Sequence, residues 1–192
     1  MTEDEAVETF YSQERWQNWL SRVEEEELDP ENEDSARLLL NLQDDAAIAI
    51  AKVLAARNEG RIDADRAVEE IHTVRDIVLA EVDFDDEDKI MLIDGVQTSL
   101  VPVFYAAEEY VVGGVVEGDV EEFVRAAAEA EAGEDLDAAL GYVVQAGTRV
   151  IDGEALDIEL VEELEYGLVS EWVNGLDSLQ SALEDPEVVE ED

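Results

Sequence analysis

The only histidine of the chain is the first candidate for chemistry. Glu69 and His72 are three positions apart, which places both side chains on one face of a helix. Di-iron carboxylate bundles use two such Glu-x-x-His pairs together with two further glutamates. A second pair cannot exist here, so the form that remains is a lone carboxylate–histidine metal site at Glu69 and His72. The alternative is an ordinary surface pair, in which His72 faces Asp76 one turn later.

An acidic segment further along the chain is a second candidate for a cation site. Asp83, Asp85 and Glu87 match positions 1, 3 and 5 of an EF-hand loop, and Asp94 falls at position 12. Asp88 stands at position 6, where the sharp turn requires glycine, and the bidentate glutamate is missing. The segment is therefore interpreted as a solvated acidic loop, and no cofactor is expected.

Two tryptophans point to a different kind of site. With Leu20 and Val23, Trp16 and Trp19 form an aromatic, apolar face on a short helix near the N-terminus. This composition is typical of the centres of protein interfaces. The sequence therefore predicts an interaction site at these four residues, for a protein partner or for a second copy of the chain. The alternative is that the same face packs on the rest of the protein.

Arginine is concentrated in residues 57–76, the least acidic region of the chain. Six acids alternate with four arginines there, which are Arg57, Arg61, Arg66 and Arg75. Alternating signs favour intramolecular ion pairs over a basic patch that releases counterions from nucleic acid. Contact with nucleic acid is therefore not expected.

Other catalytic classes lack their essential residues. Cysteine is absent, which excludes disulfides, thiolate catalysis and cysteine-ligated metals. There is no Gly-Lys dipeptide for a phosphate-binding loop, and the Gly113-Gly114 pair lacks the remaining features of a dinucleotide fingerprint. Because no catalytic set is assembled in the sequence, an enzyme is not favoured.

The net charge indicates the solvent to which the protein is adapted rather than a binding site. Of 192 residues, 54 are Asp or Glu and 11 are Lys or Arg, so the formal charge is −43. Such a chain does not bind phosphate or anionic lipid indiscriminately. Its self-repulsion opposes folding in dilute buffer, whereas at about 1 M salt the Debye length falls to about 3 Å. The acids are spread along the whole chain, so we expect a halophilic protein that needs monovalent salt to fold.

The expected cellular location rests on two targeting signals that the sequence lacks. The N-terminus has neither the positive charge nor the apolar run of a signal peptide. No apolar stretch reaches about 18 residues, the length of a membrane-spanning helix. A cytoplasmic protein without a membrane association is therefore expected.

Apolar residues recur with a period of 3.6, which predicts an all-α bundle of about seven helices with short hairpin connections. Pro102 interrupts the fourth stretch, and it either kinks one helix or separates two. The pattern predicts one domain over residues 1–184, with a weak seam at 83–89, and a frayed acidic tail at 185–192. The expected helices cover residues 13–27, 35–58, 64–82, 90–111, 119–132, 135–151 and 157–183.

Three features together resemble a family of uncharacterised acidic helical proteins of halophilic archaea. They are the segment Trp16-Gln17-Asn18-Trp19-Leu20, the helix from Leu38 to Leu54, and the turn Gly60-Arg61-Ile62-Asp63. The resemblance implies an archaeal cytoplasm and carries over no functional residue.

Two classes of function remain open. The first is a non-catalytic helical module that acts through protein–protein contact or self-association. The second is a carboxylate-dependent metal-binding protein or enzyme centred on Glu69 and His72.

Overall fold

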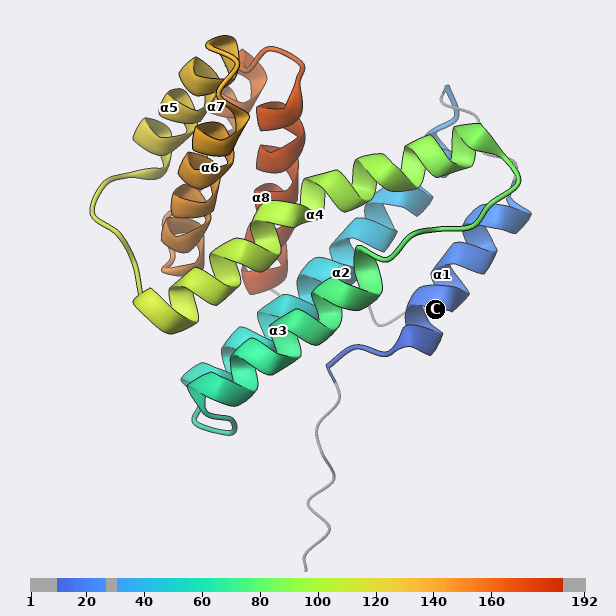
Figure 1. Ribbon diagram of the computed structural model, residues 1–192, viewed down its shortest axis with the longest axis horizontal. Helices are drawn as coiled ribbons and strands as arrows, with labels where there is room; N and C mark the ends of the chain where they lie inside the picture. The colour runs from blue at the N-terminus through green and yellow to red at the C-terminus, as the bar shows by residue number, and fades with distance from the viewer. Residues whose placement is uncertain (1–9, 27–30, 185–192) are drawn as a thin grey trace, which may run out of the picture.

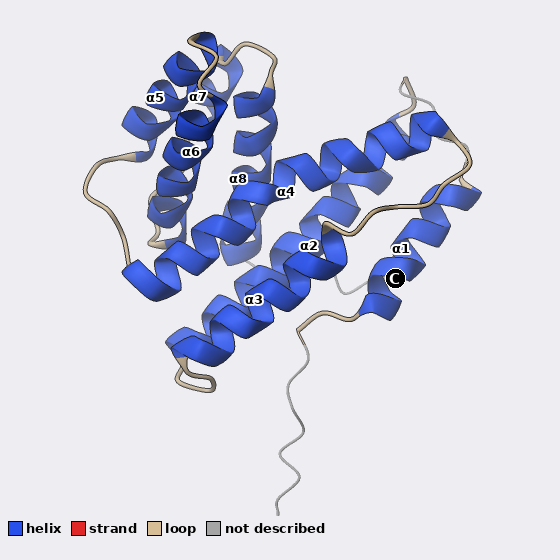
Figure 2. Ribbon diagram, in the orientation of Figure 1, coloured by secondary structure: helices blue, strands red, loops and turns tan. Residues whose placement is uncertain are grey.

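The computed structural model describes residues 10–26 and 31–184 of the chain (Figures 1 and 2). This described part contains eight α-helices and no strand, which confirms the all-α prediction. The predicted tail at 185–192 lies outside it. The helices are α1 (Gln13–Glu25), α2 (Glu33–Asn58), α3 (Ala64–Val78), α4 (Glu87–Gly113), α5 (Val120–Ala132), α6 (Leu136–Ile151), α7 (Ile158–Glu163) and α8 (Leu168–Glu184).

Polar residues, most of them aspartates, cap the starts of the helices. Each helix from α1 to α7 follows a residue whose side-chain oxygen accepts a hydrogen bond from a backbone N–H of the first turn. Such caps satisfy donors that would otherwise lack a partner, and a carboxylate there also interacts favourably with the helix dipole. The capping residues are Ser12, Asn32, Asp63, Asp86, Asp119, Asp135 and Asp157.

The prediction of one helix over residues 157–183 is wrong, because the structure has two helices there. α7 ends at Glu163 and α8 begins at Leu168. The Gly167 N–H donates to Ser170 Oγ at 2.9 Å, and the Val169 N–H donates to a carboxylate oxygen of Glu131 on α5 at 3.3 Å. These bonds satisfy the first turn of a new helix. The apolar stripe continues across the break, so periodicity alone did not show it.

α4 is the central helix of the fold. It is one helix with Pro102 inside, which answers the question that the sequence left open. It contacts α2, α3, α6 and α8, and Figure 1 shows it running obliquely from the α1–α3 side to the α5–α8 side. By length and by a mean hydropathy of 1.4 it could cross a membrane, but half of that segment is buried inside the bundle. An apolar helix that is buried in this way is typical of the core of a globular protein.

Two glycines let helices approach α4 closely. A Cβ on Gly175 of α8 would lie 1.7 Å from the Ser99 carbonyl oxygen of α4. A Cβ on Gly147 of α6 would lie 2.5 Å from the Ala106 Cβ of the same helix. α4 therefore packs on α6 and α8 with backbone close to backbone.

One cluster of buried apolar side chains draws on all eight helices of the described part of the chain. Phe84 belongs to it, although it lies in the segment where the sequence predicted a weak seam. Asp86, two residues later, caps α4 by accepting a hydrogen bond from the Asp88 N–H. The segment that connects α3 to α4 is therefore attached to the core at Phe84.

Candidate interaction surface

Trp16, Trp19, Leu20 and Val23 share one face of α1, as the sequence predicts, and this face packs on the bundle. Trp16 is 1% exposed, Val23 is fully buried, and the other two are buried as well. α1 lies against α2 and α3. This arrangement matches the alternative in which the face packs on the rest of the protein. A partner could reach these side chains only if α1 moved. The predicted interaction at these residues stays a prediction, and the exposed surfaces lie elsewhere.

A buried polar network adds to the attachment of α1. Asp45 of α2 is 3% exposed and accepts hydrogen bonds from Arg15 Nε at 2.8 Å, Arg15 Nη2 at 2.5 Å and Trp19 Nε1 at 2.9 Å. Burial, followed by the nearby Asp45 carboxylate, raises the pKa of the Tyr11 hydroxyl. A buried carboxylate held by several donors in fixed directions determines how α1 sits on α2. Arg15 and Asp45 are 30 positions apart, so the sequence offered no signal for this pairing.

His72 does not pair with either residue that the sequence offered. Its Nε2 lies 3.1 Å from a carboxylate oxygen of Glu108 on α4, a contact without the alignment of a hydrogen bond. Glu69 instead lies 3.8 Å from Arg66. The surface pair with Asp76 is therefore replaced by a contact between α3 and α4. In the described part of the chain, no group of three or more His, Asp or Glu side chains is placed to hold a metal ion.

The arginines of residues 57–76 are used mainly within the chain. Arg61 pairs with Glu59 at 2.8 Å, Arg75 with Asp76 at 3.2 Å, and Arg66 also pairs with Glu70 one turn later. These contacts are the intramolecular ion pairs that the alternation of charges predicts.

An exposed apolar groove lies between α4 and α6. It has a volume of about 530 Å³, and its walls come from the second half of α4, the residues just after it, and one face of α6. Tyr105 is 42% exposed and Val116 is 36% exposed, which is high for side chains of this size. Gly141 of α6 leaves its part of the wall open, because nothing lies within 4 Å of a Cβ built there. The other apolar residues of the groove are Leu140 and Val144.

Two further exposed apolar side chains lie on the helices that form this groove, although they do not line it. Val112 shares the Tyr105 face of α4 at a spacing of seven residues and is 74% exposed. Leu136 lies one turn before Leu140 on α6 and is 44% exposed. We call Tyr105, Val116, Leu140 and Val144 the α4–α6 groove. An exposed apolar groove bordered by polar residues is typical of interaction sites.

Carboxylates border the groove. Glu108 and Glu109 of α4 and Asp137 of α6 all line it. Glu108 has its contact with His72, whereas Asp137 lies in the first turn of α6. The groove thus combines an apolar floor with a negative border, and the described residues that line it include no Lys, Arg or His.

The sequence contained a weak signal for this groove. Tyr105 and Val112 lie off the stripe of α4 that runs through Val96, Leu100 and Phe104 into the core. In a helix as apolar as α4, such exposed residues are hard to recognise from the sequence, because the buried and exposed faces are similar in composition. An apolar residue outside the buried stripe of a helix was therefore the available clue.

Asp44 of α2 offers a test of electrostatics away from the groove. Burial raises the pKa of its carboxyl, a hydrogen bond from Ser178 lowers it, and Asp177 raises it. A carboxyl whose pKa is higher in the folded state makes folding less favourable as the pH rises through the window above 3.8, its ordinary value. This loss in the free energy of unfolding is complete once the pH exceeds the pKa of Asp44 in the folded state.

We therefore expect Asp44→Asn to stabilise the protein at pH 7. The side chain is only half-buried, so the gain is about 0.5 kcal/mol after solvent screening. Urea unfolding at pH 7 and at pH 5 measures it, and the gain should shrink at the lower pH. Removing any one acid from a chain at −43 relieves repulsion, so Glu129→Gln on the exposed face of α5 is the matched control. An equal gain in both variants would contradict the role of burial at Asp44.

The fold places this protein in the class of all-α helical bundles. Residues 9–192 match the family model described as an uncharacterized protein conserved in archaea (DUF2150), and the chain belongs to this family. The archaeal part of the sequence resemblance is thereby confirmed. The comparisons with curated proteins and with solved structures each gave no match.

Proposed function

We propose that this archaeal protein is a non-catalytic helical module of a salt-rich cytoplasm that acts through protein–protein contact. The observation that carries the proposal is the α4–α6 groove, where exposed side chains such as Tyr105 and Val116 form an apolar surface bordered by Glu108, Glu109 and Asp137. The contact is placed there because the Trp16 and Trp19 face is buried within the chain.

The occupant that fits this groove is an amphipathic segment of another protein with basic residues beside its apolar face. A groove with exposed apolar side chains from both α4 and α6 suits an amphipathic helix, which inserts residues spaced three and four apart. Lys or Arg at the edges would face Glu108, Glu109 and Asp137. A second copy of the chain is disfavoured, because it would bring another surface of a protein with charge −43 against this border.

High salt is compatible with such binding. Screening at about 1 M salt weakens the contribution of the border carboxylates to affinity. Burial of apolar surface is not screened, and it therefore supplies most of the affinity. The carboxylates then act mainly by disfavouring acidic segments, which would have to desolvate like charges against each other.

Capture from a lysate of the source archaeon in molar KCl tests the proposal. The groove variant Tyr105→Ser, Val112→Ser, Val116→Ser removes exposed side chains and should leave the fold intact. The control variant Met91→Ser, Ile158→Ser, Tyr166→Ser removes exposed apolar side chains elsewhere, of which Met91 is 71% and Tyr166 is 91% exposed.

We expect a protein with a basic amphipathic segment to be retained by the wild type and by the control variant. The groove variant should retain at least about tenfold less, which corresponds to about 1.4 kcal/mol. Equal retention by all three proteins, or retention of further copies of this chain alone, would overturn the proposal.

The halophilic part of the proposal predicts a folding transition driven by salt. Circular dichroism should show a large loss of helix in dilute buffer and full helix in molar KCl, because a charge of −43 opposes compaction until it is screened. KCl and NaCl should act alike at equal ionic strength. Full cooperative folding in dilute buffer would contradict a requirement for salt.

A further inference from the structure

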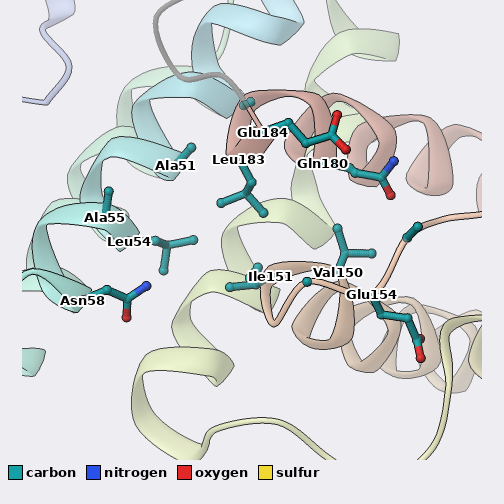
Figure 3. Close-up of a pocket in the computed structure, with 13 residues that line it drawn as sticks. Ala51, Leu54, Ala55, Asn58, Val150, Ile151, Glu154, Gln180, Leu183 and Glu184 are labelled. Atoms are coloured by element: carbon teal, nitrogen blue, oxygen red, sulfur yellow. The ribbon is translucent and has the colours of Figure 1, made fainter.

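A second cavity, away from the α4–α6 groove, lies where the C-terminal ends of three helices meet (Figure 3). Asn58 ends α2, Ile151 ends α6 and Glu184 ends α8, and all three residues line the cavity. Its volume of about 360 Å³ lies at the lower end of the range for small-molecule sites, roughly 300–1,000 Å³. The cavity is therefore of a size for a small ligand.

The walls of the cavity are mainly aliphatic. Figure 3 shows Leu54 of α2, Val150 of α6 and Leu183 of α8 around one space. The small side chains of Ala51, Ala55 and Ala182 leave that space open. Such walls suit a short hydrocarbon chain, whose burial is favourable in proportion to its area.

The wall formed by residues 152–157 is held in place by side chains. The Leu156 N–H donates to Gln180 Oε1 at 2.5 Å. Glu154 accepts a hydrogen bond from the Val120 N–H at 2.5 Å and lies 3.6 Å from Arg149. Gln180 and Glu154 thus connect the end of α6 to α8 and α5, so the cavity has a defined shape.

The potential in the cavity favours a cation. Each helix C-terminus carries about half a negative charge, and three of them converge here. Among the described residues that line the cavity, two are glutamates and none is Lys, Arg or His. Glu154 has its partners on α5 and α6, whereas Glu184 is exposed at the end of α8, in a last turn without a basic residue. Arg57 and Arg149 lie in the last turns of α2 and α6, so the negative charge of the cavity is concentrated at Glu184 of α8.

We propose that this cavity binds a free protonated aliphatic amine, with its hydrocarbon chain between α2, α6 and α8 and its ammonium group at Glu184. The carboxylate of Glu184 accepts hydrogen bonds from the ammonium, and the C-terminal end of α8, whose last turn has no basic residue, adds to the attraction. The proposal is independent of the protein contact at the α4–α6 groove, because the two sites share no residue.

Titration of uniformly labelled protein with hexylammonium, hexanol and hexanoate tests this site by NMR, in the lowest salt that keeps the chain folded. We expect hexylammonium to shift the amide signals of Ala51, Ala55 and Ile151, hexanol to bind more weakly, and hexanoate not to bind. Equal binding of hexanol and hexylammonium, or shifts confined to other residues, would overturn the proposal.

Two variants separate the contributions of charge and shape. Glu184→Gln should weaken hexylammonium about tenfold, corresponding to about 1.4 kcal/mol, and leave hexanol unchanged. Glu159→Gln, on exposed α7, is the matched control for loss of one acid and should leave both unchanged. Ala55→Leu should fill the cavity and abolish binding of both probes. An affinity for hexylammonium that Glu184→Gln leaves intact would overturn the role of the carboxylate.

Discussion

Replacing Gly175 with alanine is expected to destabilise the protein by at least about 3 kcal/mol, the upper end of the usual cost of overpacking. The new Cβ would lie 1.7 Å from the Ser99 carbonyl oxygen, a backbone atom that cannot move as a side chain does. Relief requires α8 to move away from α4, which opens the packing around both helices. Because domains are stable by only about 5–15 kcal/mol, the loss should be evident in urea unfolding followed by circular dichroism.

Gly95→Ala is the matched control for this prediction. Gly95 lies on α4, one turn before Ser99, and nothing lies within 4 Å of a Cβ built there. The same substitution should therefore stabilise by about 0.5–1 kcal/mol, the intrinsic preference of a helix for alanine over glycine. If Gly175→Ala were as well tolerated as Gly95→Ala, the close approach of α8 to α4 would be wrong.

Replacing Arg15 with alanine should have the second large effect. It leaves the Asp45 carboxylate, which is 3% exposed, without its charged partner, while Trp19 Nε1 still donates to it. Removing one partner of a buried pair costs about 3–5 kcal/mol, and the partial exposure of Arg15 places this variant at about 3 kcal/mol. Because the network attaches α1, tryptophan fluorescence should shift to the red before the other helices unfold.

Two comparisons make this prediction specific. Asp45→Asn removes the charge but keeps an acceptor for Trp19, so it should cost less than Arg15→Ala. Arg125→Ala removes an exposed arginine that pairs with Glu121 and Glu163, and it should change stability little. An Arg15→Ala variant as stable as Arg125→Ala would show that the Asp45 network does not hold α1.

Local chemistry made most of the helices predictable. The period of 3.6 located every helix from α1 to α6 to within a few residues, and Ser12, Asp63 and Asp119 are of the residue types favoured at helix starts. The end of α3 at Val78 was less visible, because Gln97 of α4 satisfies the Val78 and Ala80 carbonyls with its amide. Such a bond joins residues distant in sequence and leaves no trace in periodicity.

The candidate site was harder to predict for the same physical reason. An aromatic face on a short helix has the same composition whether it meets a partner or its own bundle, so Trp16 and Trp19 did not reveal that they are buried. The groove depends on α4 and α6 lying side by side, which brings Tyr105 and Leu140 together. Neither residue is informative alone. Tertiary packing decides which apolar residues remain exposed.

Site-specific photo-cross-linking tests the central claim most directly. A photoreactive phenylalanine analogue in place of Tyr105 would lie in the α4–α6 groove, and the same group in place of Met91 would be exposed on the first half of α4. In lysate of the source archaeon at molar KCl, we predict an adduct at position 105, with a basic amphipathic segment of another protein, and none at position 91. No adduct at position 105, equal adducts at both positions, or an adduct with a second copy of this chain would contradict the account.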